Sequence, residues 1–366
     1  MSSSLKPLVA SAWLLMVVLV SVILIGGREV LVRLALAVLL WQLINAIAAF
    51  YRRIRIGGWV AASWQALSLG VLTIVLALLF VIDLIVDNVG AVTAAAPTYQ
   101  ANLLALLPHL ADFLGLPHPE SLGPLVGQVD LGLWIRSISL ALVSFTSNIG
   151  LVVLYVAFML LEQATFPRKI DALFPDPAKA ASVRGLLHHI ESRIERYLWV
   201  KTIFSLATAV LSWCVLAAIG CQQAGFWALI IFMINYIPIV GSFFGVVFPS
   251  LLVLVQFGAL GPFLATVVGL SAVQVSLGNV LEPRFMGSSL NLSPMVIVVS
   301  LAVWGSIWGI AGMFLCVPIM VIIVIVCSHF PATRNVAILL SADGRLDEAV
   351  AGGAPSRVGA TPNAIG

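Results

Sequence analysis

The stretch at residues 279–287 reads NVLEPRFMG, and it decides how the surrounding chain must fold. Glu282 and Arg284 are the only permanently charged residues between positions 202 and 333, in a run that is otherwise rich in apolar residues. A charge in such a run is costly, so it usually faces a bundle interior or an aqueous cavity. Pro283 lacks a backbone donor and predicts a broken helix between the two charges. The alternative is a short loop at the membrane surface with a solvated ion pair.

The composition of the chain is typical of a multi-spanning membrane protein. Of its 366 residues, 61% are hydrophobic and 9% are charged, whereas an average soluble protein has about 25% charged residues. The sequence therefore predicts an all-α polytopic protein whose principal partner is the lipid bilayer. It has no basic run with interleaved aromatic residues, so it does not indicate nucleic acid as a partner. The four cysteines have no metal-ligand spacing.

The N-terminal region, residues 1–82, is predicted to contain three transmembrane helices, at residues 8–25, 30–50 and 59–82. The first of these is longer than the apolar core of a signal peptide, which favours an uncleaved span. The densest basic cluster of the chain follows the second span, at residues 51–57. The positive-inside rule places this loop, and with it the N-terminus, in the cytoplasm.

Composition changes divide the middle of the chain. Residues 83–136 hold five acids, one base and several prolines, which predicts an extracytoplasmic segment with an amphipathic helix. Residues 137–161 read as a fourth transmembrane helix, and residues 162–200 as a cytoplasmic amphipathic segment. The last residues, 331–366, are predicted to form a cytoplasmic tail.

Residues 201–330 are predicted to form a transmembrane transport core with helices broken near residues 235–249 and 279–294. The two breaks share a pattern of Asn, then Pro, then Gly: Asn235, Pro238 and Gly241 in the first, and Asn279, Pro283 and Gly287 in the second. Helices broken at corresponding positions point to a transport site and suggest an inverted repeat. Whether residues 294–327 form one span or two stays open.

Three motifs carry a family resemblance: RYLWVKT at residues 196–202, NYIPIVGS at 235–242, and GNVLEPRFMG at 278–287. The last leads into LSP at 292–294 and WGSIWGIAG at 304–312. Together they resemble the autoinducer-2 exporter family of bacterial membrane proteins. The resemblance implies about eight spans, a homo-oligomer (a pentamer), and a multi-pass protein of the bacterial inner membrane with both termini in the cytoplasm.

The resemblance also implies a substrate class, a small polar furanone-like signalling molecule that is exported from the cell. Other family members are sodium(lithium)/proton antiporters, so substrate does not follow from family alone. The chain departs from the family pattern at Ala209, at the single Pro249 and in the turn at residues 221–226.

We predict secondary transport along a path near the bilayer midplane. Backbone groups freed at Pro238 and Pro283 would bind substrate hydroxyls or water. Neutral donors and acceptors suited to an uncharged, polyol-like substrate would come from Asn235, Asn279, Gln256 and Gln274. The alternatives are a sodium(lithium)/proton antiporter and a passive channel. The chain has no H-E-x-x-H, G-x-S-x-G or Walker A motif, so neither an enzyme nor a cofactor or metal site is expected.

The role of Glu282 has two interpretations. Burial favours the neutral form of a carboxyl group, which would let Glu282 carry a coupling proton. A neighbouring cation favours the charged form, so a tight pair with Arg284 would make both residues structural. Lys201, at the entrance of the fifth span, is expected to be a snorkelling anchor rather than part of the pathway.

Overall fold

The computed structural model describes residues 5–53, 62–114, 149–286 and 291–344. Within these ranges the chain consists of helices and their connections, with no strand. Among the described residues, six helices are long and apolar enough to cross a membrane, or up to seven if one bent pair is counted as a span. The prediction of an all-α polytopic membrane protein is therefore confirmed. The parts of the predictions that fall on residues 54–61, 115–148, 287–290 and 345–366 lie outside the described residues.

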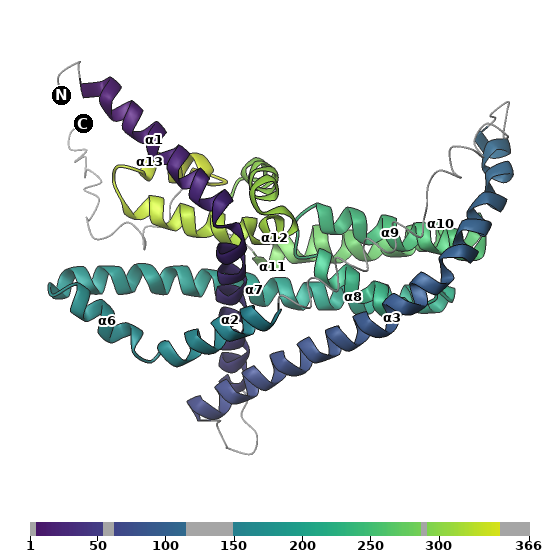
Figure 1. Ribbon diagram of the computed structural model, residues 1–366, viewed down its shortest axis with the longest axis horizontal. Helices are drawn as coiled ribbons and strands as arrows, with labels where there is room; N and C mark the ends of the chain where they lie inside the picture. Colours follow the sequence, from purple (N-terminus) through teal and green to yellow (C-terminus); the bar gives the residue numbers. More distant parts are fainter. Residues whose placement is uncertain (1–4, 54–61, 115–148, 287–290, 345–366) are drawn as a thin grey trace, which may run out of the picture.

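The N-terminal helices are α1 (Leu5–Gly26), α2 (Arg28–Arg53) and α3 (Ser63–Leu114). Helices α2 and α3 pack together with the helix Ile149–Glu162 through a buried apolar cluster. The backbones of α2 and α3 approach closely at Gly70, where an added Cβ would lie 2.9 Å from the Ile44 carbonyl oxygen. In Figure 1, α2 crosses the long helices of the molecule steeply.

Helix α3 is one continuous helix where the sequence predicted a span followed by a separate amphipathic segment. Its 52 residues extend about 78 Å, more than twice the roughly 30 Å hydrocarbon core of a bilayer. The apolar part is Ser63–Asn88. The helix continues beyond it because the alanine-rich residues 91–96 are strong helix formers. Figure 1 shows the extension passing beside the ends of α8 and α9 and then turning upward.

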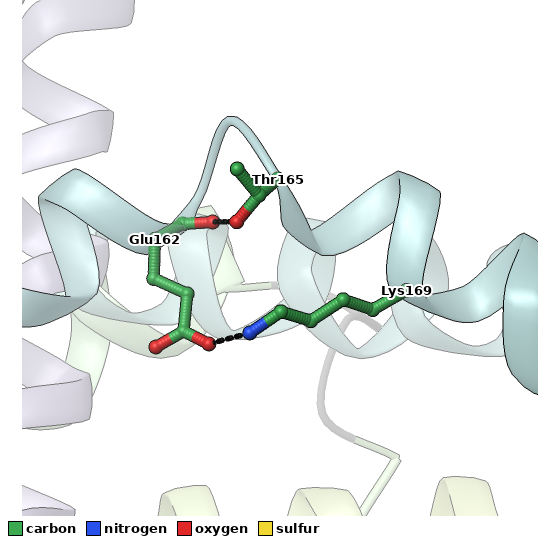
Figure 2. A network of polar contacts seen from close by, with 3 residues as sticks. All are labelled: Glu162, Thr165 and Lys169. Atoms are coloured by element: carbon green, nitrogen blue, oxygen red, sulfur yellow. Dashed lines mark hydrogen bonds and ion pairs between the residues drawn. The ribbon is translucent and has the colours of Figure 1, made fainter.

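A sharp bend precedes the long helix that enters the transport core. The helix Ile149–Glu162 meets α6 (Phe166–Leu173) at 67°. At this bend the Thr165 hydroxyl donates to the Glu162 carbonyl oxygen at 2.9 Å, and Lys169 forms an exposed ion pair with the Glu162 carboxylate, as Figure 2 shows. Exposed ion pairs contribute little to stability, so these contacts orient the turn rather than hold the fold.

Helix α7 (Pro177–Ile219) runs without interruption through the predicted cytoplasmic segment and the fifth span. Proline occupies its first position, and the Asp176 carboxylate accepts a hydrogen bond from the Ala178 N–H at 3.0 Å, so the helix has a well-defined start. It ends at Gly220, whose φ of 82° suits a glycine C-cap. The 43 residues extend about 64 Å, so α7 projects well beyond one bilayer.

Helices α8 (Ala224–Ile234), α9 (Val240–Phe257) and α10 (Leu260–Gln274) pack with the second half of α7 around a buried apolar cluster. The chain leaves helical structure at residues 235–239, next to Pro238, and α9 continues through Pro249. The first predicted break is therefore confined to residues 235–239.

The second predicted break takes a different form. After α10 the chain widens into a π-helix, Val275–Leu281, and continues directly as α11 (Glu282–Met286). Pro283 lies directly after the π-helix and cannot donate a backbone hydrogen bond to it, which interrupts the regular bonding pattern at this point. The irregularity predicted from Pro283 is thus a π-helical segment, a form that often occurs at functional sites.

Helix α12 (Pro294–His329) is interrupted at Gly309, whose φ of 64° and ψ of −143° are not helical, so residues 294–327 contain two helical segments. The segments on either side of Gly309 lie against each other. An added Cβ on Gly312 would lie 1.9 Å from the Trp304 carbonyl oxygen, and one on Gly305 would lie 2.9 Å from Met313. Helix α13 (Arg334–Leu340) returns to the start of α12, where the Ser293 N–H donates to the Leu340 carbonyl oxygen at 3.1 Å.

We expect Gly312→Ala to destabilise the protein by about 1–3 kcal/mol, the usual cost of overpacking, because the new methyl group would overlap the Trp304 carbonyl. Thermal unfolding of the detergent-solubilised protein measures this. Gly261→Ala is the matched control, since a Cβ there would meet nothing within 4 Å. Equal unfolding temperatures for the two variants would contradict the close approach.

Candidate functional site

A cavity of about 710 Å³ lies where α7, α10, the π-helix and α12 meet the break between α8 and α9. Six of the ten predicted site residues line it: Lys201, Asn235, Pro238, Gln274, Asn279 and Glu282. They come from three separate stretches of the chain: α7, the break between α8 and α9, and the continuous stretch at residues 274–282. The fold thus brings polar side chains from distant parts of the sequence around one space.

A buried ion pair forms one wall of this cavity. The Lys201 ammonium group, on α7, donates to Oε1 of Glu282, on α11, at 2.6 Å, and the two side chains are 8% and 9% exposed. A charge-assisted hydrogen bond of this kind is strong. Each charge neutralises the other where water cannot do so, and a lone charge at this position would be very costly.

The partner of Glu282 differs from the one that the sequence suggested. Arg284 is exposed and does not line the cavity, whereas Lys201, expected to be a snorkelling anchor, is buried and paired. Residues two apart on a helix point in widely different directions. Glu282 therefore faces the bundle while Arg284 faces away from it, and α7 supplies the cation.

The break between α8 and α9 is attached to α7 by two side-chain hydrogen bonds. The Asn235 side-chain amide donates to the Ser205 hydroxyl at 3.0 Å, and the hydroxyl groups of Tyr236 and Thr202 lie 2.7 Å apart. Ser205 is one helical turn from Lys201, so the ion pair and the break share one face of α7. Thr202, Ser205 and Tyr236 were not among the predicted site residues. Their signal in the sequence is polar residues at helical spacing within an apolar run.

The tip of the break is strained. Ile239 has φ 65° and ψ −53°, and the Val240 N–H donates to the Pro238 carbonyl oxygen at 2.6 Å, which closes a γ-turn. This conformation is rare and unfavourable for a β-branched residue. Position 241 requires glycine, because a Cβ added to Gly241 would lie 2.3 Å from the Ile234 carbonyl oxygen. Strain held by the surrounding structure is a feature of ligand clamps and switch regions.

Gln274 is among the residues that line the cavity, and its side-chain amide is buried and uncommitted. Its side chain is buried, and neither the amide nitrogen nor the amide oxygen has a hydrogen-bond partner within the described residues. Two glycines leave room for it: a Cβ on Gly245 would lie 3.0 Å from the Gln274 amide nitrogen, and one on Gly278 would lie 3.5 Å from the amide oxygen. A free donor and a free acceptor are thus held side by side at the cavity wall.

The remaining predicted residues lie outside the cavity lining. Gln256, at the end of α9, donates to the Gly220 carbonyl oxygen at 3.0 Å and accepts from the Gln222 N–H at 2.8 Å. The extension of α3 joins the same end of the bundle, where the Tyr99 hydroxyl donates to the Gln222 side chain at 3.1 Å. Gln256 therefore has a structural role at the end of the bundle. Pro283 is exposed beside Arg284.

We expect Lys201→Met to destabilise the protein by about 3–5 kcal/mol, because it leaves the Glu282 carboxylate buried and unpaired. The double variant with Glu282→Met should recover most of that loss, since an apolar pair can replace a buried ion pair at little cost. Thermal unfolding compares both with Arg284→Met, which should have a small effect. A Lys201→Met protein as stable as Arg284→Met would disprove the pairing.

Comparison with known proteins shows the family of the chain. Residues 9–332 match the profile of the AI-2E family transporter. The AI-2 transport protein TqsA of Escherichia coli is 29% identical over 346 residues, which cover 92% of this chain and 98% of that protein. A candidate transport protein of Haemophilus influenzae is 30% identical over 284 residues, or 76% of this chain and 81% of its own length. With helices suited to crossing a membrane and a family match over most of its length, the chain belongs to the AI-2E family of membrane transporters.

Proposed function

We propose that the protein is a secondary transporter that exports a small, polar, uncharged solute similar to autoinducer-2. The observation that carries the proposal is the cavity beside the helix break, which joins a buried ion pair to uncommitted polar groups. Its volume of about 710 Å³ falls within the usual range for small-molecule sites. The similar Escherichia coli protein is named for AI-2 transport, which supports this choice of solute.

The charge balance of the cavity favours a neutral solute. Lys201 and Glu282 neutralise each other, so the wall they form has no net charge to offer an ionic ligand. Gln274 and Asn279 offer both donors and acceptors, as the hydroxyl groups of a polyol require. An ion that entered the cavity would lose its hydration shell and would find no unpaired opposite charge there to compensate for that loss.

We propose that Glu282 couples transport to protons, and that its pair with Lys201 separates when a proton binds rather than persisting as a purely structural contact. Its carboxylate is held by one cation, Lys201, on a different helix. A proton on Glu282 would remove the charge that holds Lys201, which would free α7 and α11 to separate. The strained turn at Ile239 lies on the same cavity and would move with the break. Proton binding and rearrangement of the cavity are then one event.

The proposed orientation has both termini in the cytoplasm of a bacterial cell, with the protein in the inner membrane. The first half of α7 is largely exposed and carries both basic and acidic side chains, which suits the cytoplasmic surface. We also propose a homo-oligomer, a pentamer in keeping with the family resemblance. Apolar side chains such as Phe248 and Leu251 on α9 are exposed and available to lipid or to a neighbouring subunit.

Flux in proteoliposomes with an imposed pH gradient tests this function, with autoinducer-2 as the solute. We expect gradient-driven flux in the wild type, loss of the gradient dependence in Glu282→Gln, and normal flux in Arg284→Gln, which changes an exposed charge nearby. Gln can still accept a hydrogen bond from Lys201 but leaves its charge unneutralised, so a monodisperse elution profile of Glu282→Gln is required before flux is compared. Flux that ignores the gradient and survives Glu282→Gln would refute coupling and leave a passive channel. Gradient-driven sodium or lithium flux without the solute would instead support an antiporter.

The Gln274 amide should bind the solute directly. Because one neutral hydrogen bond contributes about 0.5–1.5 kcal/mol, we expect Gln274→Leu to raise the KM for transport by up to about tenfold. Gln256→Leu is the matched control, because Gln256 lies at the end of the bundle and should change stability rather than KM. Identical KM values for wild type and Gln274→Leu would exclude this contact.

A further inference from the structure

The side of the cavity that the start of α9 forms includes an apolar surface. Phe243, Val246 and Val247 line the cavity and lie three and four residues apart from the first of them, so they occupy one face of the first two turns of α9. Ile239, the residue directly before α9, also lines the cavity. We call these four residues the apolar wall, because none of them carries a polar side-chain atom. The ion pair and the amides elsewhere in the lining give the cavity sides of different chemistry.

The two largest side chains of the apolar wall are poorly covered by the rest of the protein. Ile239 is 61% exposed and Phe243 is 59% exposed. The Phe243 ring meets the Phe244 ring at a centroid distance of 5.1 Å and an interplanar angle of 80°. This contact orients the Phe243 ring while more than half of the residue stays uncovered. Uncovered apolar surface that lines a cavity is suited to binding the apolar part of a ligand.

Ile239 occupies its place on the apolar wall despite backbone strain. Its φ of 65° is unfavourable for a β-branched residue. A side chain that is 61% exposed gains little from packing within the protein, so local packing does not compensate for the strain. Strain of this kind is characteristic of sites that bind a ligand or change shape. The strained isoleucine therefore points to a ligand that makes apolar contact at the tip of the break.

Polar groups lie next to the apolar wall. A neighbouring face of α9 carries Ser242 and Gly245, which pack against residues 274–278. A Cβ on Gly245 would lie 3.0 Å from the Gln274 amide nitrogen, and one on Gly278 would lie 3.7 Å from the Ser242 hydroxyl oxygen. The Gln274 amide and the apolar wall thus line the same cavity from adjoining sides. A solute in this part of the cavity meets hydrogen-bonding groups on one side and hydrocarbon on another.

We propose that the cavity selects small, uncharged amphiphiles, with adjacent hydroxyl groups on one side and methyl or methylene groups on the other, and that the apolar wall binds the hydrocarbon side. An amide offers a donor and an acceptor side by side, which suits two adjacent hydroxyl groups. A fully hydroxylated polyol would place hydroxyl groups against the apolar wall, where they lose hydrogen bonds to water. The inference rests on the proposed function, because it defines the chemical class of the transported solute, but binding alone can test it.

Saturation-transfer NMR of the full-length protein in lipid nanodiscs tests this selectivity. The ligands are glycerol, 1,2-propanediol, 1,2-butanediol and 1,2-pentanediol, and the signal from empty nanodiscs is subtracted. We expect the Kd to fall about fourfold with each methylene group that the apolar wall buries. Saturation should reach the alkyl protons more strongly than the protons beside the hydroxyl groups. Kd values that do not fall along the series, or diols that bind no better than glycerol, would overturn the proposal.

Variants assign the effect to the apolar wall. Phe243→Ser places a hydroxyl group on the wall, and the pair Val246→Thr with Val247→Thr does so with a smaller change of shape. Both should reduce the gain in affinity to less than about twofold per methylene group. Phe248→Ser is the matched control, because Phe248 is an exposed phenylalanine of the same helix that does not line the cavity. A monodisperse elution profile verifies the folding of each variant.

The outcomes separate this inference from the transport function. A dependence on chain length that is lost in the wall variants and kept in Phe248→Ser would support the inference even in a protein without flux. A dependence that persists in both wall variants, or that Phe248→Ser also abolishes, would overturn it, since the alkyl chain would then bind a surface that faces lipid or a neighbouring subunit.

Discussion

The buried contact between Lys201 and Glu282 is the interaction on which the C-terminal half depends. In an apolar bundle neither charge can be stabilised by water, so each requires the other at short range. This requirement joins α7 to α11 although 81 positions separate the two residues in the chain. The same face of α7 also holds the break between α8 and α9 through Ser205. One helix thus organises the charge, the break and the cavity between them.

The close approach of neighbouring helix backbones is the second constraint, and it helps to position the polar groups around the cavity. Glycine permits it at Gly241, where α9 starts against the end of α8, and at Gly312, where the two segments of α12 meet. Gly245 and Gly278 instead leave room for the Gln274 amide. Tight packing in some places and uncommitted polar atoms in others suit a protein that must stay folded while part of its interior exchanges partners.

Much of the architecture could be predicted because its signals are local. Apolar runs indicate spans, and proline removes a backbone donor wherever it occurs, so the break beside Pro238 was predictable. Glu282 could be singled out because it is the only carboxylate in the apolar run between positions 202 and 333. The continuity of α3 was missed, since its acidic residues and prolines resemble a boundary although the alanine-rich residues 91–96 sustain the helix. The π-helix before Pro283 was also missed, because it depends on how the turn is packed rather than on one residue.

The sequence by itself determined the all-α membrane class, the family, and which residue types are available for a transport site. Only the tertiary structure decided their partners. Arg284 is two positions from Glu282 and Lys201 is 81 away, yet the pair forms with Lys201. Gln256 and Gln274 look equivalent in the sequence, but one joins the end of the bundle and the other faces the cavity. The reason is physical: helix geometry sets which face a side chain occupies, but the packing of helices sets what that face meets.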